Sequence, residues 1–205
     1  MKIVVAYRHA AYDSPWRVIP SSREGRFNRA CEDGPTQYLA LHPLGPTAEL
    51  LRHQLRGPDP ERADMILAKL WAILLDVEGS VDVTFDNCAS DYGITPEELV
   101  GDDYAPTQAL AAHLRGAGVP GFTVASAALP GTDNLILFGP RVAHPYLEVP
   151  VTPEECPTGH LNDGARPARE VLPLVRWKGA SHSALDAWVV TGTYEKLDDP
   201  LAVRW

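Results

Sequence analysis

The alternation of apolar and polar positions along the chain predicts a set of short strands. Segments rich in β-branched and aromatic residues, bounded by turn residues, lie at 3–8, 36–41, 81–85, 122–126 and 134–138. Near the end of the chain, LDAWVVTGTYEKL at 185–197 alternates in the same way and predicts a last strand. The stretch SHSALD at 181–186 is interpreted as a polar loop before that strand, because Ser, His and Asp so close in sequence cannot form a catalytic triad.

Capping residues and helical spacing predict helices between these strands. The strongest pattern covers residues 60–77, where Asp59 is a candidate N-cap and apolar residues recur at helical spacing. We expect this helix to lie in the core. A shorter helix is expected to begin at Pro46 and Thr47, and it would carry Glu49 in its first turn.

Two further helices are marked by their ends. The sequence TPEE at 95–98 has the spacing of a capping box and opens a short helix that ends near Val100. Another helix is expected from Pro106 to Arg115, because glycines follow it. The chain of 205 residues shows no repeat and no low-complexity tract, so residues 1–205 are expected to form a single α+β domain with a mixed β-sheet and flanking helices.

The composition is that of a globular protein that folds without disulfides or metals. Apolar residues make up 45% of the chain, and no stretch reaches the roughly 18 apolar residues of a membrane span. The N-terminus lacks the pattern of a secretory signal, so we expect a cytoplasmic protein. Cys31, Cys88 and Cys156 are far apart and are expected to be reduced, partly buried thiols. The scattered histidines argue against a metal site.

Charge is distributed unevenly, in a way that favours a small anionic ligand. The net charge of −9 argues against bulk nucleic-acid binding, which depends on Lys and Arg. Residues 1–60 nevertheless carry eight Lys and Arg against six acids, and five arginines fall between positions 8 and 29. Arginine binds phosphate oxygens through paired hydrogen bonds, so this cluster fits a phosphate-bearing small molecule. A solvated basic face with scattered ion pairs would produce the same count.

Common nucleotide-binding and hydrolase signatures are absent from the sequence. It contains no GxGxxG, Walker, HExxH or GxSxG motif, so the usual signs of Rossmann, P-loop, zincin and α/β-hydrolase proteins are missing. What remains is a series of short polar motifs separated by predicted structure. They are GRFN at 25–28, QYLA at 37–40, AEL at 48–50 and VASAALPGTDNLILF at 124–138.

The residues in that series suit cleavage of the bond between nicotinamide and ribose in NAD. Nicotinamide leaves as a neutral base, so the barrier lies in forming a ribosyl oxocarbenium ion, which a carboxylate such as Glu49 can stabilise. Arg26 could bind the pyrophosphate. Tyr38 offers a ring face to nicotinamide or ribose, and Ser126 offers a hydroxyl that fixes orientation.

Each residue also has a structural explanation when it is taken singly. Glu49 could compensate the helix dipole at the surface, and Tyr38 could be a half-buried packing residue of a strand. Ser126 could be a strand-end hydroxyl bonded to backbone, Arg8 a member of an edge-strand ion pair, and Asn134 a turn residue. The ordered set is more specific than any one member, and it favours a site.

Taken in order, these motifs resemble the RES family, which is named for its Arg, Glu and Ser. The resemblance covers roughly residues 5–140 and leaves a C-terminal extension, about 150–205, without a counterpart. The positions that match the family's arginines, tyrosine, glutamate and serine are Arg8, Arg26, Tyr38, Glu49 and Ser126. By the same resemblance Asn134 is a candidate for bracing the serine loop, and the expected NAD contacts are Arg8, Arg26, Tyr38 and Asn134.

The resemblance implies a fold like that of ADP-ribosyltransferases and a toxin that depletes NAD, with an Xre-type helix-turn-helix protein as its antitoxin. It implies no cofactor, since NAD is the substrate. Two departures stand out. Glu24 precedes Gly25, Arg26 and Phe27 where the family often has Gly-Gly-Arg-Trp, and Ala125 stands where it often has Pro before the serine. The first keeps an aromatic residue, whereas the second bears on the conformation of the serine loop.

These observations predict an enzyme, an NAD glycohydrolase or NAD phosphorylase, that releases nicotinamide from NAD and passes ADP-ribose to water or inorganic phosphate. The same chemistry would serve an ADP-ribosyltransferase that modifies a protein target. The site residues identified from the sequence do not determine whether water, phosphate or a protein accepts ADP-ribose. A third hypothesis, from another class, is a catalytically silent module whose acidic surface binds a basic partner. Neither nucleic acid nor a membrane is expected as a direct partner.

Overall fold

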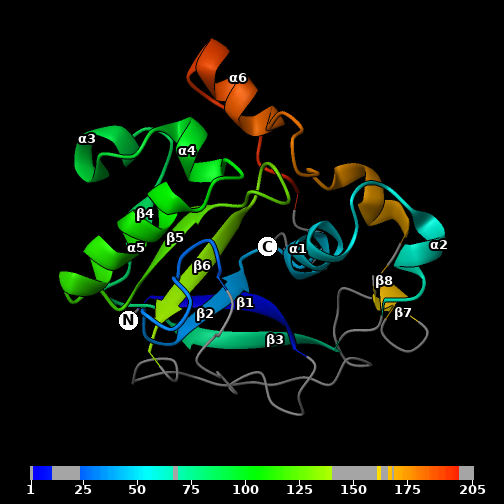
Figure 1. Cartoon of the computed structure of the whole chain (residues 1–205), viewed down its shortest axis with the longest axis horizontal. Helices are drawn as coiled ribbons and strands as arrows, with labels where there is room; N and C mark the ends of the chain where they lie inside the picture. The colour runs from blue at the N-terminus through cyan, green and yellow to red at the C-terminus, as the bar shows by residue number, and fades with distance from the viewer. Residues whose placement is uncertain are drawn as a thin grey trace.

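A six-stranded mixed β-sheet forms the centre of the protein (Figure 1). The computed structural model describes residues 2–10, 24–66, 69–139, 161–162, 166–167 and 169–198. The strands are β1 (Ile3–Ala10), β2 (Thr36–Ala40), β3 (Lys69–Asp76), β4 (Val81–Val83), β5 (Gly121–Ala125) and β6 (Asp133–Phe138). They follow the order β3-β1-β2-β6-β5-β4, and every pair is antiparallel except β4 and β5. The predicted α+β class with a mixed sheet is confirmed.

Helices lie on both sides of this sheet in the view of Figure 1, with α3, α4 and α5 on the left and α1 and α2 on the right. The helices are α1 (Gly45–Gln54), α2 (Pro60–Ala63), α3 (Cys88–Tyr92), α4 (Pro96–Val100), α5 (Ala105–Gly116), α6 (Ser183–Thr191) and the 3-10 helix η1 (Arg169–Leu174). A separate two-stranded sheet joins β7 (Leu161–Asn162) and β8 (Arg166–Pro167). Within the described ranges, the helices are all too short or too polar to cross a membrane.

Several local predictions are confirmed by these elements. The capping box at the start of α4 is present, because Thr95 accepts from the backbone N–H of Glu98 while the Glu98 carboxylate accepts from the backbone N–H of Thr95. Helix α5 ends at Gly116, one residue beyond the predicted end, and Gly118 follows it in the left-handed region at φ 75°. Local hydrogen bonds between near neighbours decide these boundaries, so the sequence is sufficient to find them.

The core divides into three apolar clusters around the sheet. The first packs α3, α4 and α5 against one face, and the second joins α1, α2 and η1. Successive side chains of β6 point to opposite faces, so Ile136 belongs to the first cluster while Leu135 and Leu137 belong to the third. The cavity of the candidate site is lined by Phe27 and Tyr38 of the first cluster and by Leu39 of the third.

The helix predicted over residues 60–77 is wrong beyond its first turn. Asp59 does cap a helix, since its carboxylate accepts from the Arg62 N–H at 3.0 Å, but α2 ends at Ala63. The apolar run that follows is β3, which pairs with β1 along all eight of its residues. Its buried side chains alternate with half-buried ones, as in a strand. A short apolar run fits either a helix or a strand until its pairing partner is known.

The strand predicted over residues 185–197 is also wrong, because α6 occupies most of it. His182 is the N-cap of this helix, since its Nδ1 accepts from the Leu185 N–H at 3.2 Å, and Gly192 ends the helix in the left-handed region at φ 73°. The stretch 181–186, interpreted as a polar loop, therefore contains a helix start. The alternating pattern predicted the wrong structure because α6 is mostly exposed. Only Ala184 and Leu185 are buried, so the apolar positions of this segment do not mark a buried face.

The cysteines differ from one another in their surroundings. Both described cysteines are free thiols, but neither is partly buried as expected: Cys88 is buried at the start of α3, and Cys31 is exposed. Burial raises the pKa of the Cys88 thiol, which keeps it protonated at neutral pH. Cys156 lies outside the described residues.

Candidate active site

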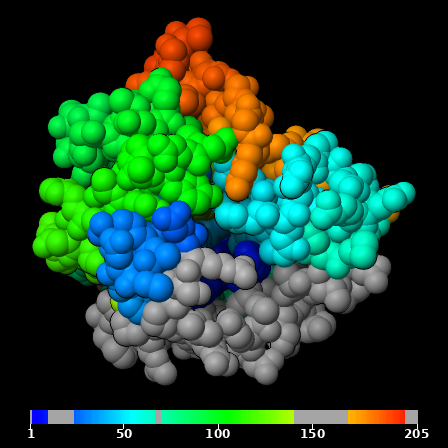
Figure 2. Space-filling view, viewed as in Figure 1, coloured from blue at the N-terminus to red at the C-terminus, as the bar shows by residue number. Residues whose placement is uncertain are grey.

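A cavity of about 320 Å³ opens between α1, residues 24–27 and the strands β1 and β2. Its walls include five of the six residues singled out from the sequence: Arg8, Arg26, Tyr38, Glu49 and Asn134. In Figure 2 the dark-blue atoms of β1 are visible where the cavity opens, between the blue segment that follows residue 24 and the cyan helix α1. The volume is in the range of small-molecule sites.

The GRFN motif forms a tight turn that presents Arg26. The backbone groups of Gly25 and Asn28 bond to each other in both directions, at 3.0 and 3.3 Å. The first turns of α5 hold this turn, because Gln108 Nε2 donates to the Gly25 carbonyl at 3.0 Å and Thr107 Oγ1 donates to the Arg26 carbonyl at 2.7 Å. The backbone that carries Arg26 is therefore fixed on both sides.

Gly25 and Phe27 have separate reasons for their identity. A Cβ on Gly25 would lie 2.4 Å from Asn28 Oδ1 and 2.6 Å from the Tyr38 hydroxyl oxygen, so only glycine fits there. Phe27 is buried and meets Phe122 edge to face, with ring centroids 5.2 Å apart. The departure from the usual tryptophan of the family thus retains the aromatic contact with the core.

Tyr38 joins β2 to the same turn through its hydroxyl. The hydroxyl donates to Asn28 Oδ1 at 2.7 Å and accepts from the Phe27 N–H at 3.0 Å. Burial raises the pKa of Tyr38 above its ordinary value, so the phenol stays protonated at neutral pH. Because its hydroxyl is bonded to the turn, Tyr38 offers the cavity its ring rather than an acid or a base.

Glu49 is held by a partner that is distant in sequence. Asn134 Nδ2 on β6 donates to Glu49 Oε1 at 3.0 Å, and His53 Nε2 lies 3.9 Å from Glu49 Oε2. The prediction that Glu49 lies in the first turn of its helix is wrong, because α1 begins at Gly45 and Glu49 falls beyond that turn. The helix dipole acts mainly within the first turn, so the hydrogen bond from Asn134 orients this carboxylate instead.

Arg26 enters the cavity beside an aromatic ring. Its guanidinium carbon lies 5.0 Å from the centroid of the Tyr104 ring, and its Nη1 donates to the Leu99 carbonyl at 3.5 Å. Its Nη2 is buried and has no hydrogen-bond partner among the residues that the structure describes. Burial lowers the pKa of Arg26, while the charge of Glu49 acts in the opposite direction. Arg26 and Glu49 both line this cavity, so their charges face the same space.

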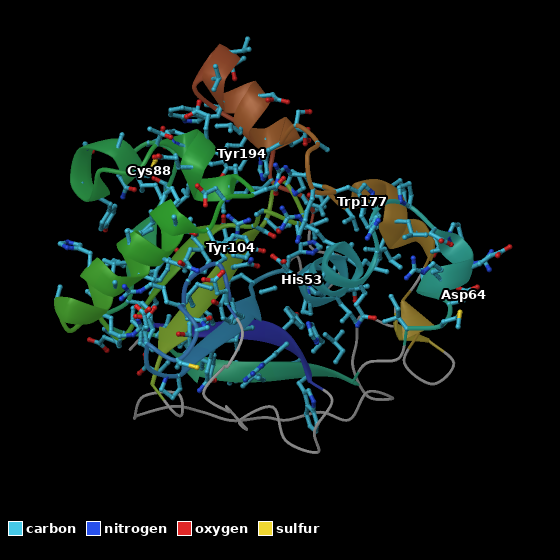
Figure 3. The ribbon with its side chains drawn as sticks, in the orientation of Figure 1. His53, Asp64, Cys88, Tyr104, Trp177 and Tyr194 are labelled. Carbon is cyan, nitrogen blue, oxygen red and sulfur yellow. The ribbon has the colours of Figure 1, made fainter. Side chains whose placement is uncertain are left out.

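The cavity also contains residues that the sequence did not single out. Four such residues line it, and Figure 3 labels two of them, His53 and Tyr104, near the centre of the molecule; the other two are Arg52 and His9. Arg52 and His53 follow Glu49 by three and four positions, so helical spacing would have placed them on the same face. No sequence signal pointed to Tyr104. Burial lowers the pKa of His9 to about 4 and, despite the nearby Glu49 charge, also lowers the pKa of His53.

Ser126 is fully buried and is not part of the cavity lining. Its Oγ accepts from the backbone N–H groups of Ala128 and Leu129, at 3.3 and 3.1 Å, and so stabilises the turn after β5. The bonding of its hydroxyl to backbone matches the structural explanation considered for this residue. A direct contact between Ser126 and NAD stays a prediction.

The C-terminal extension supports the serine loop, residues 126–133. His182 Nδ1 accepts an N–H, so its Nε2 carries the proton and donates to the Ser126 carbonyl at 3.0 Å. The backbone N–H of Arg176 donates to the Ala128 carbonyl at 2.8 Å, and that of Leu197 to the Gly131 carbonyl at 2.9 Å. In its described part, the extension adds no strand to the central sheet but bonds to this loop.

Comparisons with known proteins relate this arrangement to other chains. The model of the RES domain matches residues 4–157. The chain is 34% identical over 120 residues to the probable NAD(+) phosphorylase Rv3189 of Mycobacterium tuberculosis, across 58% of this chain and 55% of that protein. It therefore spans about half the length of this relative. A chain of the M. tuberculosis MbcT–MbcA toxin–antitoxin complex shares the fold, with a TM-score of 0.59 and 18% identity over 75% of this chain and 86% of that one.

Proposed function

This chain belongs to the RES domain family, and we propose that it cleaves the nicotinamide–ribose bond of NAD and passes ADP-ribose to inorganic phosphate or water. The observation that carries this proposal is the meeting of Glu49, held by Asn134, with Arg26 in one cavity. A relative described as a probable NAD(+) phosphorylase supports the same chemistry. The residues of the cavity supply a role for each part of the substrate.

Glu49 is the group proposed to stabilise the reacting carbon. As nicotinamide departs with the bonding electrons, positive charge develops on the ribose, and a carboxylate held in one orientation stabilises it. Asn134 provides that orientation through its 3.0 Å hydrogen bond. The lowered pKa of His53 keeps its imidazole neutral at pH 7, so His53 does not cancel the charge of the carboxylate.

The remaining residues are proposed to bind the parts of NAD that do not react. Arg26 has a buried Nη2 without a partner in the described part of the chain, and a pyrophosphate oxygen is a suitable acceptor for it. Arg8 lines the same cavity from β1. The rings of Tyr38 and Tyr104 offer apolar faces for nicotinamide or ribose. Such contacts position the substrate and lower the barrier by holding it near Glu49.

We further propose that the protein acts in the cytoplasm as the toxin of a toxin–antitoxin pair, with a helix-turn-helix protein as its antitoxin. The support is the fold shared with a chain of the MbcT–MbcA toxin–antitoxin complex, together with membership of the family. Expression in a bacterial host should lower cellular NAD and arrest growth. Co-expression with a helix-turn-helix protein encoded beside it should restore growth, and the two proteins should copurify.

The direct test is release of nicotinamide from NAD by the purified protein, followed chromatographically with and without phosphate. Glu49→Gln keeps the size of the side chain and removes its charge, so release should fall by about 100-fold to 1000-fold. Glu97→Gln makes the same change at an exposed position of α4 and should leave the rate unchanged. Intact NAD in every condition, with folded protein, would overturn the proposal.

A further inference from the structure

Arg52 is a buried cation in the cavity wall that has no part in the steps above. It lies three positions after Glu49 on α1, lines the cavity and is only 2% exposed. Its Nη2 pairs with Asp102, whereas its Nε is buried without a hydrogen-bond partner among the described residues. A buried N–H donor left without an acceptor is unfavourable, so the pattern points to an acceptor supplied from outside the chain.

Asp102 holds Arg52 in place and is itself held. It accepts from the Gly179 N–H at 2.6 Å and lies 3.1 Å from Arg176 Nη1, in addition to its pairing with Arg52. Burial alone would raise the pKa of Asp102, but these bonds and charges outweigh it and lower the pKa, so the carboxylate stays ionised. Since two arginines share one carboxylate, one positive charge remains unbalanced beside the cavity.

Positively charged side chains around the cavity add to the effect of burial in lowering the pKa of Arg26 and of His53. The charge of Arg52 lowers the pKa of Arg26, and Arg26, Arg52 and Lys178 all act to lower the pKa of His53. The cavity lining as a whole contains three arginines and two glutamates, in a chain whose net charge is −9. Cations brought together in this way are stabilised by an anion placed among them, in addition to Glu49.

We propose that Arg52 binds the inorganic phosphate that accepts ADP-ribose, in a subsite beside Glu49. This inference rests on the proposed function, since it names the acceptor of that reaction. A phosphate dianion approaching Glu49 would be repelled unless a cation stood next to the carboxylate. Arg52 meets that need because residues three positions apart share a helix face. Arg26 and Arg8 remain available for the pyrophosphate of NAD.

The step balances without any further reactant. A phosphate oxygen forms a bond to C1″, the ribose carbon that carries nicotinamide, as the bond from C1″ to nicotinamide breaks. The bonding pair stays on the ring nitrogen, so nicotinamide leaves as a neutral molecule. The other product is ADP-ribose 1″-phosphate, and the proton of hydrogen phosphate stays on its phosphate group.

The test measures nicotinamide release at increasing concentrations of inorganic phosphate. Release by the wild type should rise and saturate. Arg52→Gln should raise the half-saturating phosphate concentration by about tenfold or more, since a charge-assisted pair is lost, while the KM for NAD changes by less than about threefold. The control is Arg56→Gln, which removes the same charge at an exposed residue outside the cavity lining and should match the wild type.

Phosphate binding is also measured without NAD, through the melting temperature. Inorganic phosphate should stabilise the wild type and Arg56→Gln but not Arg52→Gln, because a ligand that binds the folded state raises the melting temperature. If Arg52→Gln does not fold, Arg52→Lys is measured in its place. It retains a charge opposite Asp102 but lacks the Nε donor, so the half-saturating phosphate concentration should still rise, by about threefold or more, and an unchanged value would overturn the subsite.

Failure of this inference differs from failure of the proposed function. If the wild type releases no nicotinamide, NAD cleavage is wrong, and the melting temperature measured at increasing phosphate still decides whether Arg52 binds phosphate. Release that does not depend on phosphate in the wild type overturns the acceptor subsite. An unchanged phosphate response in Arg52→Gln does the same. A variant in which only the KM for NAD rises assigns Arg52 to the pyrophosphate and also overturns it.

Discussion

Replacing Asn134 by aspartate changes the way Glu49 is held, because it exchanges an N–H donor for an acceptor of almost the same size. In the protein, Asn134 Nδ2 donates to Glu49 Oε1 at 3.0 Å, and Asn134 is only 8% exposed. In Asn134→Asp the cavity wall would contain two carboxylates at that separation. Like charges this close cannot both stay ionised without a large electrostatic penalty.

The size of this penalty follows from the distance. At 3.0 Å and an effective dielectric constant of about 20, two unit charges repel by about 5.5 kcal/mol, equivalent to about 4 pKa units. Side-chain rotation reduces this value, and so does solvent, because the Glu49 side chain is 24% exposed. We therefore expect the carboxylate pair to share a proton up to a pH about 1 to 3 units higher than isolated carboxylates allow. While the proton is shared, stabilisation of the ribosyl cation is weaker.

The assay is the pH dependence of kcat/KM for nicotinamide release. The acid limb of the profile should move to higher pH by about 1 to 3 units in Asn134→Asp, with activity recovered at alkaline pH. Gln54→Glu adds the same charge at an exposed position of α1, outside the cavity lining, and should leave the limb where it is. An unmoved limb in a folded Asn134→Asp protein would show that the Glu49 carboxylate does not act as proposed.

Two further predictions concern buried polar side chains, Ser126 and His9. Ser126→Ala removes the acceptor of two buried backbone N–H groups, so the free energy of unfolding should fall by about 1 to 3 kcal/mol with little change in nicotinamide release. A loss of release beyond about 100-fold at an unchanged melting temperature would instead place the hydroxyl against the substrate. Burial lowers the pKa of His9 from 6.5 to about 4, so the unfolded chain binds the proton more tightly, and stability present above pH 6.5 should be lost as pH falls towards 4. The melting temperature of His9→Gln should vary less over that window, and an equal decline in both proteins would contradict this cause.

The elements that could be found from the sequence are those whose boundaries depend on near neighbours. The capping box of Thr95 and Glu98 closes within four residues, and the cap on Asp59 closes just as locally. Strands β1, β2, β5 and β6 also agree with their predicted positions, because each is bounded by turn residues and carries a strong apolar pattern. In these cases propensity and tertiary packing favour the same structure.

The two incorrect elements show where local pattern is insufficient. The apolar run of β3 satisfies helical spacing, and only its pairing with β1, whose residues lie 59 to 73 positions earlier, makes it a strand. Residues 185–197 alternate like a strand in the sequence, but helix α6 occupies residues 183–191, is capped by His182 and Gly192, and buries only its first turn. For β3, contacts outside the segment determine its conformation, whereas the caps of α6 are local, and the alternating pattern of a mostly exposed segment concealed them.

For the site, the order of the short motifs was enough to propose which residues take part, since Arg8, Arg26, Tyr38, Glu49 and Asn134 all reach one cavity. Their mutual contacts could not be read from that order. Asn134 meets Glu49 across 85 positions, and Arg52 pairs with Asp102 across 50. Residue types and spacing carry local chemistry, whereas contacts at such separations exist only after the sheet and α1 have packed. In the packed structure the Ser126 hydroxyl accepts hydrogen bonds from backbone N–H groups and does not line the cavity. The same packing brings Arg52 and Tyr104 to the cavity wall.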